Sequence, residues 1–237
     1  MKTGYWATHR YSRRSVERDV EEFVGWPKLE KLISKVPEYN RERNQALFAA
    51  TFLTGGRIEE VLQLVKSNFT VDLEAGEIII RGMKLLKRYE KTGSWIEWID
   101  QKPKNKLARL YSFDEGKKQF HRNRFTTEKK DETRREFRFA TTENFASILI
   151  EWLRKTQELL FNGYFTSKPL SYPMAYRIIT ATGMYPHWLR AQRASCLISE
   201  YGWKMEMMME WMGWEELTTA RHYAKYGPSS LVAGKKS

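Results

Sequence analysis

Cysteine is almost absent from this chain of 237 residues. The single copy, Cys196, excludes a disulfide framework within the chain and any zinc site built from several cysteines. We interpret it, in the stretch SCLI, as a small buried side chain. The chain also lacks the run of about 18 apolar residues that a membrane-spanning helix needs, and its N-terminus lacks the apolar centre of a signal peptide. We therefore expect a protein of the reducing cytoplasm.

Residues that hold metals or nucleotides are also scarce. The four histidines are scattered, without an i, i+4 pair and without carboxylates at ligand spacing: His9, His121, His187 and His222. The phosphate-cradling loops GxxxxGKS/T and GxGxxG do not occur. We therefore expect no metal and no small-molecule cofactor.

Positive charge is what the chain has in excess. Its 41 Lys and Arg residues outnumber 29 Asp and Glu residues, for a formal net charge of +12, while 41% of the residues are hydrophobic. That apolar content is too high for a disordered basic tail, so the composition predicts a folded basic domain. Its partner should be a polyanion, and nucleic acid is the polyanion that we favour.

The excess charge is concentrated in residues 81–138, which hold 18 Lys and Arg against 9 Asp and Glu. Aromatic residues are interleaved with these charges: Tyr89, Trp95, Trp98, Tyr111, Phe113, Phe120, Phe125, Phe137 and Phe139. Basic side chains grip phosphates, and aromatic rings stack on exposed bases or anchor a loop to a core. We favour nucleic-acid contact over a solvated hairpin packed by its own aromatics, because the charge of the whole chain agrees.

Glycine, proline and hydrophobic period divide the chain into helices around a small sheet. Helices are predicted first at residues 15–24, 27–36, 42–53 and 57–65, the third stopped by Gly55 and Gly56. A period of two then predicts a hairpin at 69–73 and 78–80 and a strand at 133–140, with an irregular basic insertion of about fifty residues between them. Helices return at 143–160, 171–181, 187–202, 205–212 and 215–226. This order predicts an α+β fold that is mostly α.

Arg57 is the first candidate functional residue. It follows the glycine turn in TGGRIEE, at the start of a predicted helix. A cation is unfavourable at the positive end of a helix unless an anion occupies the same place. The alternative is a surface charge paired with Glu60 one turn further on.

Three further segments carry candidate residues near the C-terminus. HWLR places His187 and Arg190 three residues apart, on the same side of one helix. EWMGW ends a Met-rich helix at a glycine, and Tyr223 follows nine residues after Trp214.

Together these segments resemble the boxes of the tyrosine recombinase (integrase) family, whose catalytic domain is shared in outline with type IB topoisomerases. TGGRIEE is similar to the family's T-G-x-R-x-x-E box, and HWLR is similar to its H-x-x-R box. WMGW stands where the family has Gly-His or, in some members, Gly-Trp, and a tyrosine follows at the spacing of the nucleophile. Order and spacing over residues 54–223 carry the resemblance. The C-terminal stretch is most similar to integrases of archaea and of archaeal viruses or mobile elements.

The resemblance implies an enzyme that cleaves and rejoins DNA strands without metal or ATP. Arg57 and Arg190 would stabilise the charge that develops on the phosphate, with Glu60 supporting the first arginine. His187 would accept a proton or bind the phosphate, and Trp214 would donate its indole N–H. Tyr223 would attack phosphorus and form a 3′-phosphotyrosine; spacing favours it over Tyr226 and Tyr201.

The general acid is implied to be a lysine of a β-hairpin between Arg57 and His187. The segment MKLLKRYEK resembles an archaeal form of this hairpin, which favours Lys87. Four other lysines remain candidates: Lys84, Lys91, Lys129 and Lys130.

The implied organisation is a helical segment at residues 1–40, a catalytic domain at 41–226 with the basic insertion at 92–132, and a tail at 227–237. Many relatives carry a further DNA-binding domain of about 100 residues ahead of the catalytic one, which we do not find here. The implied partners are double-stranded DNA and further copies of the chain, in a tetramer on DNA in the host cytoplasm or nucleoid. Two alternatives remain: a catalytically idle DNA-binding relative, and a relaxase similar to type IB topoisomerases.

Overall fold

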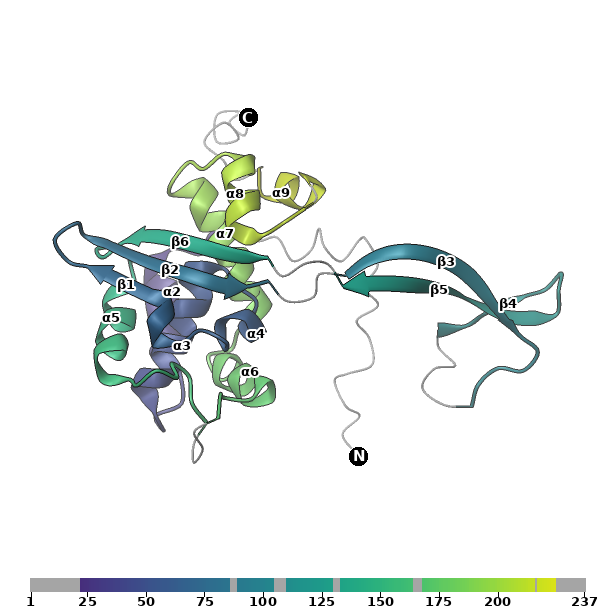
Figure 1. Ribbon diagram of the computed structural model, residues 1–237, viewed down its shortest axis with the longest axis horizontal. Coiled ribbons are helices and arrows are strands. Elements are labelled where there is room, and N and C mark those ends of the chain that lie inside the picture. Colours follow the sequence, from purple (N-terminus) through teal and green to yellow (C-terminus); the bar gives the residue numbers. More distant parts are fainter. Residues whose placement is uncertain are drawn as a thin grey trace, which may run out of the picture. The chain divides into compact units, whose positions relative to one another are not determined.

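The structure is a computed structural model that describes residues 22–85, 89–104, 110–129, 133–163, 168–215 and 217–224. The chain divides into two compact units (Figure 1). The larger unit combines Met1–Leu85 with Arg134–Ser237, and the smaller unit is the intervening Leu86–Thr133.

Along the sequence of the larger unit, helices come before and after the strands of a small sheet. Its helices are α2 (Trp26–Ile33), α3 (Arg41–Thr54), α4 (Ile58–Val61), the short 3-10 helix η1 (Lys66–Asn68), α5 (Ala146–Lys155), α6 (Tyr172–Thr180), α7 (Pro186–Ser199), α8 (Met205–Met212) and α9 (Leu217–Ala224). Its antiparallel sheet consists of β1 (Phe69–Asp72), β2 (Glu77–Lys84) and β6 (Arg134–Ala140), in the order β1-β2-β6. The predicted α+β class is confirmed.

Helix α3 forms the centre of the larger unit. Its apolar run ALFAATFL is buried over its whole length, and the helix packs against α5 and α7. Phe52 meets Trp26 and Phe145 edge to face, with ring centroids 5.7 and 5.9 Å apart. The helix ends at Gly55, whose φ of 57° is left-handed and therefore suits a residue without Cβ.

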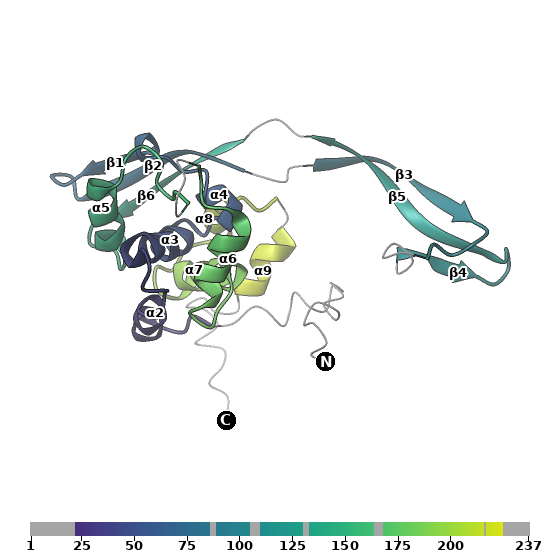
Figure 2. The same ribbon diagram turned by 90° about the horizontal axis from the view of Figure 1, so that it is seen from below.

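The sheet covers one side of these helices (Figure 2). Strand β6 alternates between exposed and buried residues, and Phe137 and Phe139 pair in register with Ile80 and Ile78 of β2. These four side chains belong to the same core as α3. The alternation predicted this strand correctly, because one face of the sheet is buried and the other is open.

Helix α4 is much shorter than the sequence predicts. The prediction of a helix over residues 57–65 is wrong beyond Val61. The backbone of Val65 forms an antiparallel bridge with Leu159, and the N–H of Lys66 donates to the carbonyl of Glu158 at 2.7 Å. These long-range bonds replace the helical ones, so tertiary pairing overrides the local period.

Most other helices lie where the sequence predicts them, and the helix at 205–212 matches α8 residue for residue. The predicted helix at 15–24 falls largely outside the described residues, and the chain at residues 22–25 is not helical.

The described residues of the smaller unit form a second β-sheet, so the prediction of an irregular insertion is wrong. It contains β3 (Tyr89–Ile99), β4 (Ser112–Asp114) and β5 (Gln119–Lys129), in the antiparallel order β3-β5-β4. Strands β3 and β5 pair from Tyr89 with Lys129 to Ile99 with Phe120. Both faces mix apolar and charged residues, so the sequence lacks the alternation that marks a half-buried strand.

Among the described helices, none combines the length and the apolar character that crossing a bilayer requires.

We expect Gly55→Ala to destabilise the protein more than Gly202→Ala. The two glycines have similar left-handed φ values, 57° and 64°, so each alanine loses about 1 kcal/mol to backbone strain. At Gly55 the added Cβ would also lie 2.7 Å from Sδ of the buried Met212, whereas nothing lies within 4 Å at Gly202. The extra loss should be about 1–3 kcal/mol in urea unfolding. Equal losses would show that Met212 moves aside freely.

Candidate active site

The turn after α3 holds Arg57 in a defined position. The Thr54 hydroxyl donates to the carbonyl of Ala50 (2.7 Å) and accepts the N–H of Gly56 (3.0 Å), which closes the turn. Arg57 is the N-cap of α4, and the Glu60 carboxylate accepts from both its backbone N–H and its Nη1, each at 2.9 Å. Glu60 is fully buried, while the Arg57 side chain is 41% exposed. The pairing with Glu60 is confirmed, and it leaves the guanidinium at the surface.

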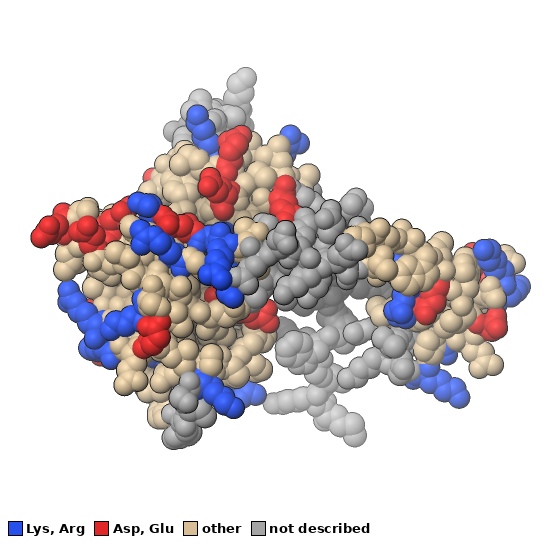
Figure 3. Space-filling model, in the orientation of Figure 1, with Lys and Arg blue, Asp and Glu red and all other residues tan. Residues whose placement is uncertain are grey.

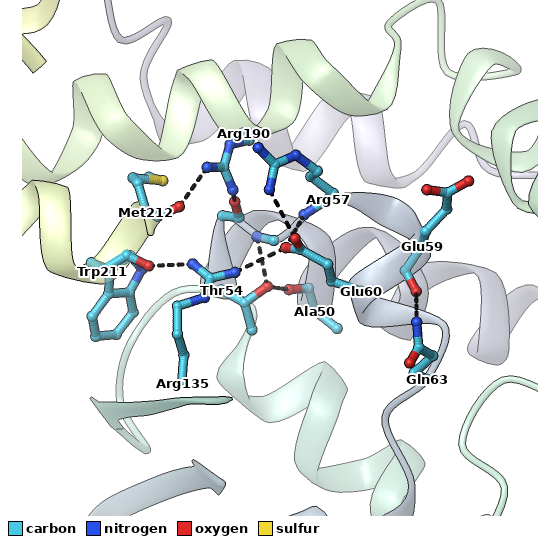
Figure 4. A network of polar contacts seen from close by, with 12 residues as sticks. Ala50, Thr54, Arg57, Glu59, Glu60, Gln63, Arg135, Arg190, Trp211 and Met212 are labelled. Carbon is cyan, nitrogen blue, oxygen red and sulfur yellow. Dashed lines mark hydrogen bonds and ion pairs between the residues drawn. The ribbon is translucent and has the colours of Figure 1, made fainter. Parts of the chain in front are cut away.

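Arg190 joins two segments that are far apart in the sequence. Its Nη1 donates to the carbonyl of Gly55, and its Nη2 donates to the carbonyl of Met212 at 2.5 Å. Arg190 is 3% exposed, and its Cζ lies 5.8 Å from the centre of the Trp214 ring. The arginine of α7 therefore connects the turn before Arg57 with the end of α8. In Figure 4 the guanidinium groups of Arg190 and Arg57 are drawn next to each other above this turn.

The end of α8 places Trp214. Gly213 adopts a φ of 63°, and the backbone N–H of Trp214 donates to the carbonyl of Met209 at 2.9 Å. These two features end the helix. The Trp214 side chain is half-buried and packs on a cluster of α7, α8 and α9 that includes Met212. The glycine stop that the sequence predicts after the Met-rich helix is confirmed.

Arg135 is a site residue that the sequence reasoning missed. It lies on β6, where its Nη2 bonds Glu60 Oε2 at 2.9 Å and its Nη1 donates to the carbonyl of Trp211 at 2.5 Å. Its side chain is 7% exposed. The signal was present in the strand's alternation, because Arg135 occupies the inward register of Phe137 and Phe139. A basic residue in an apolar register indicates a buried partner.

One carboxylate, that of Glu60, therefore binds two arginines. Arg57 and Arg135 share Glu60, whereas the two bonds of Arg190 go to neutral carbonyls. Three guanidinium groups, from Arg57, Arg135 and Arg190, thus gather around the turn after α3. The arrangement can hold an anion that carries negative charge on several oxygens.

His187 lies in the first turn of α7, one turn before Arg190, and is exposed. Pro186 precedes it at a position where a missing N–H costs nothing. The N-terminus of α7 adds the partial positive charge of a helix end to this side of the unit.

The remaining predicted residues lie at or beyond the edge of what the structure describes. Tyr223 belongs to α9, which packs against α7 and α8 through the buried Ala220, but its side chain is outside the described residues. Lys87 is outside them too, as are Lys130 and Tyr226. Lys84 is at the end of β2, opposite Arg134, while Lys91 and Lys129 are placed only as backbone in β3 and β5. The choice of lysine and of tyrosine thus stays a prediction.

Two groups, one on α7 and one in the turn after it, have raised pKa values. Burial, with a contribution from Glu143, raises the pKa of the Tyr201 hydroxyl to about 12. Tyr201 also follows the C-terminal end of α7, away from His187, so it is poorly suited to attack a phosphate at the N-terminal end. Burial likewise raises the pKa of the Cys196 thiol to about 12, which confirms it as an unreactive core side chain.

The chain has the fold of the catalytic domain of tyrosine recombinases, as the motif resemblance predicts. One similar structure is the XerH site-specific recombinase bound to palindromic difH substrate in a post-cleavage complex, with a TM-score of 0.55 and 20% identity over 90% of this chain and 52% of that one. The pre-cleavage complex of XerH with difH gives a TM-score of 0.52 and 20% identity over 91% and 53%. XerA recombinase gives 0.49 and 16% over 90% and 64%.

This chain therefore spans about half the length of the XerH chains. No protein-family model and no curated protein matches the sequence.

We expect Arg135→Met to lower the free energy of unfolding by about 3–5 kcal/mol, because it leaves the buried Glu60 carboxylate with one partner fewer. Urea unfolding measures the loss. The double variant Arg135→Met, Glu60→Met should lose less than the sum of the two single variants, since it removes both buried charges.

Arg138→Met is the matched control, since it removes the same side chain from the same strand on its exposed face. It should change stability by no more than about 0.5 kcal/mol. Additive losses in the double variant would contradict the Arg135–Glu60 pairing.

Proposed function

We propose that this chain is the catalytic part of a site-specific DNA recombinase, which cleaves and rejoins strands through a covalent 3′-phosphotyrosine. One observation carries the proposal. The Arg190 guanidinium bonds the carbonyls of Gly55 and Met212, so the three boxes that resemble the family's meet at one place. Segments more than 130 residues apart in the sequence are joined by this one side chain.

The electrostatics of the site suit a phosphodiester. Attack at phosphorus adds negative charge to the phosphoryl oxygens, and fixed guanidinium groups stabilise that charge without reorganisation. Glu60 orients Arg57, and the backbone carbonyls of Gly55 and Met212 orient Arg190. Both guanidinium groups are therefore held in fixed positions before the substrate binds.

The proposed step moves one proton at each end of the reaction. The Tyr223 hydroxyl attacks phosphorus and loses its proton, for which His187 at the start of α7 is the acceptor or the phosphate ligand. The bond from phosphorus to the 5′-oxygen breaks, and Lys87 protonates that leaving oxygen. The phosphotyrosine conserves the phosphodiester, so attack by a free 5′-hydroxyl reseals the strand with neither ATP nor metal. Trp214 donates its indole N–H to a phosphate oxygen and covers the site.

The partners follow from the same proposal. The XerH complexes hold their difH substrate before and after cleavage. By extension we assign duplex DNA to this chain, with a tetramer forming on the DNA inside the cytoplasm. The proposed catalytic domain covers residues 41–226, between a helical segment at 1–40 and a tail at 227–237.

We expect Tyr223→Phe to abolish a covalent protein–DNA adduct on a nicked suicide duplex, because phenylalanine has no oxygen to attack phosphorus. The adduct is read on a denaturing gel, in buffer with EDTA, since guanidinium groups supply the charge that a metal would. DNA binding and stability should stay unchanged, because the substitution removes a single hydroxyl.

Three variants serve as controls for this experiment. Tyr226→Phe should still form the adduct, and Arg57→Ala and Arg190→Ala should form it roughly 10²–10³ times more slowly. If Tyr226→Phe loses the adduct and Tyr223→Phe keeps it, the nucleophile is Tyr226, about one helical turn further along the chain. If the wild-type chain forms no adduct, the result favours the catalytically idle DNA-binding alternative. If it forms the adduct and relaxes a plasmid but never recombines it, the result favours the relaxase.

A further inference from the structure

The smaller unit, Leu86–Thr133, has no core of its own in its described part. None of the side chains described in it, at residues 92–104, 110–126 and 133, is buried, and the buried side chains that the structure describes all belong to the larger unit. A three-stranded sheet normally needs a covered apolar face for stability in water. The described strands of this unit therefore lack the buried apolar face that usually stabilises a sheet.

Large apolar side chains lie open on both faces of this sheet. Trp95 (49% exposed) and Phe113 (44%) are on one face, and Ile96 (49%) and Phe125 (45%) are on the other, as the cross-strand register requires. Exposed apolar groups concentrated in one small unit mark an interaction surface.

Basic side chains on the Trp95 face are held in place by one carboxylate. Glu97 accepts from Nε of Arg122 and from the hydroxyl of Tyr111 (2.8 Å), and Nε of Arg124 lies 3.5 Å away. The bonds from Arg122 and Tyr111 keep the pKa of Glu97 below its usual value, so the carboxylate stays ionised. Trp95 and Arg124 are direct cross-strand partners. The face therefore combines an open indole ring with two arginines, of which the Arg124 side chain is 44% exposed and the Arg122 side chain 13%.

The charge of the unit selects among possible occupants. Residues 86–133 contain 13 Lys and Arg against 8 Asp and Glu. On the face drawn in Figure 3, basic side chains of this unit stand among a few acidic ones on a largely uncharged surface. A second copy of the chain would bring the same positive charge, whereas nucleic acid brings the opposite one. A two-stranded β-ribbon also has the width that the major groove of duplex DNA admits.

We propose that the β3–β5 ribbon is a second DNA grip, in addition to the DNA contact proposed for the larger unit. Arg122 and Arg124 contact phosphates, and Trp95 packs against the groove wall beside them. The inference rests on the proposed function for its choice of duplex DNA. It adds an element that extends the bound length of DNA and takes no part in the bond-breaking step.

The register of the ribbon gives a clean way to remove it. Lys91 and Thr127 are cross-strand partners, so residues 92–126 can be replaced by Asn-Gly, a two-residue hairpin turn. This variant, which we call armless because it lacks most of the β3–β5 ribbon, keeps all the described buried residues and all the proposed catalytic residues, Lys87 included. It should fold as the full chain does, which its urea unfolding curve checks.

The test is a titration of a 40-bp duplex of arbitrary sequence, a length of about four helical turns, by fluorescence anisotropy at several KCl concentrations. The armless variant should bind at least tenfold more weakly at low salt. Its slope of log Kd against log salt should fall by about 2, the value for two lost phosphate contacts. Equal affinity and equal slope for the two proteins would overturn the inference. Unchanged DNA binding with a lost self-association in sedimentation would assign the surface to a second copy instead.

Two point variants test the face that we assign. Trp95→Ala should weaken binding, whereas Ile96→Ala, equally exposed on the opposite face, should leave it unchanged. The reverse result would overturn the assignment of the face.

The adduct assay separates this inference from the proposed function. Adduct formed by the armless variant at saturating DNA, together with unchanged affinity, would reject the second grip alone. No adduct from either protein, together with reduced affinity of the armless variant, would reject the proposed chemistry and keep the grip.

Discussion

A buried carboxylate is the constraint on which the candidate site depends. Glu60 is fully inaccessible, and an ionised carboxylate in such a place is tolerated only when charged partners surround it. Arg57 and Arg135 supply those partners, one from the turn after α3 and one from β6. Because Arg135 also bonds the carbonyl of Trp211, the same carboxylate connects the sheet, α4 and α8.

Arg190 is held by a different kind of interaction, with a different consequence. Its guanidinium donates to backbone carbonyls at two glycine-containing turns, those of Gly55 and of Met212 before Gly213. A carbonyl orients a guanidinium without cancelling its charge. The site therefore combines an ion-pair network around the buried Glu60 with an arginine that backbone carbonyls orient.

The two units of the chain are stable for different reasons. The larger unit buries α3 and a sheet face in one apolar core, so single changes there are expected to cost stability. The described residues of the smaller unit are held by backbone pairing, an arginine–glutamate–tyrosine network, ring contacts such as Phe113 with Phe120, and cation–π contacts such as Lys117 over Trp98 at 3.9 Å. Substitutions on its surface should therefore change binding more than folding.

The roles expected of Arg57, His187 and Arg190 come from the resemblance of their boxes to those of a known family. Most helices and the alternation of β6 were predicted from local signals in the sequence. Those features depend on hydrophobic period and on glycine stops, which act within a few residues. The end of α4 at Val61, the sheet of the smaller unit and the role of Arg135 depended on contacts between distant segments. Only the tertiary structure decided them, because the bridge of Val65 with Leu159 joins distant segments, and because the register of β6 turns Arg135 inward without identifying Glu60 as its partner.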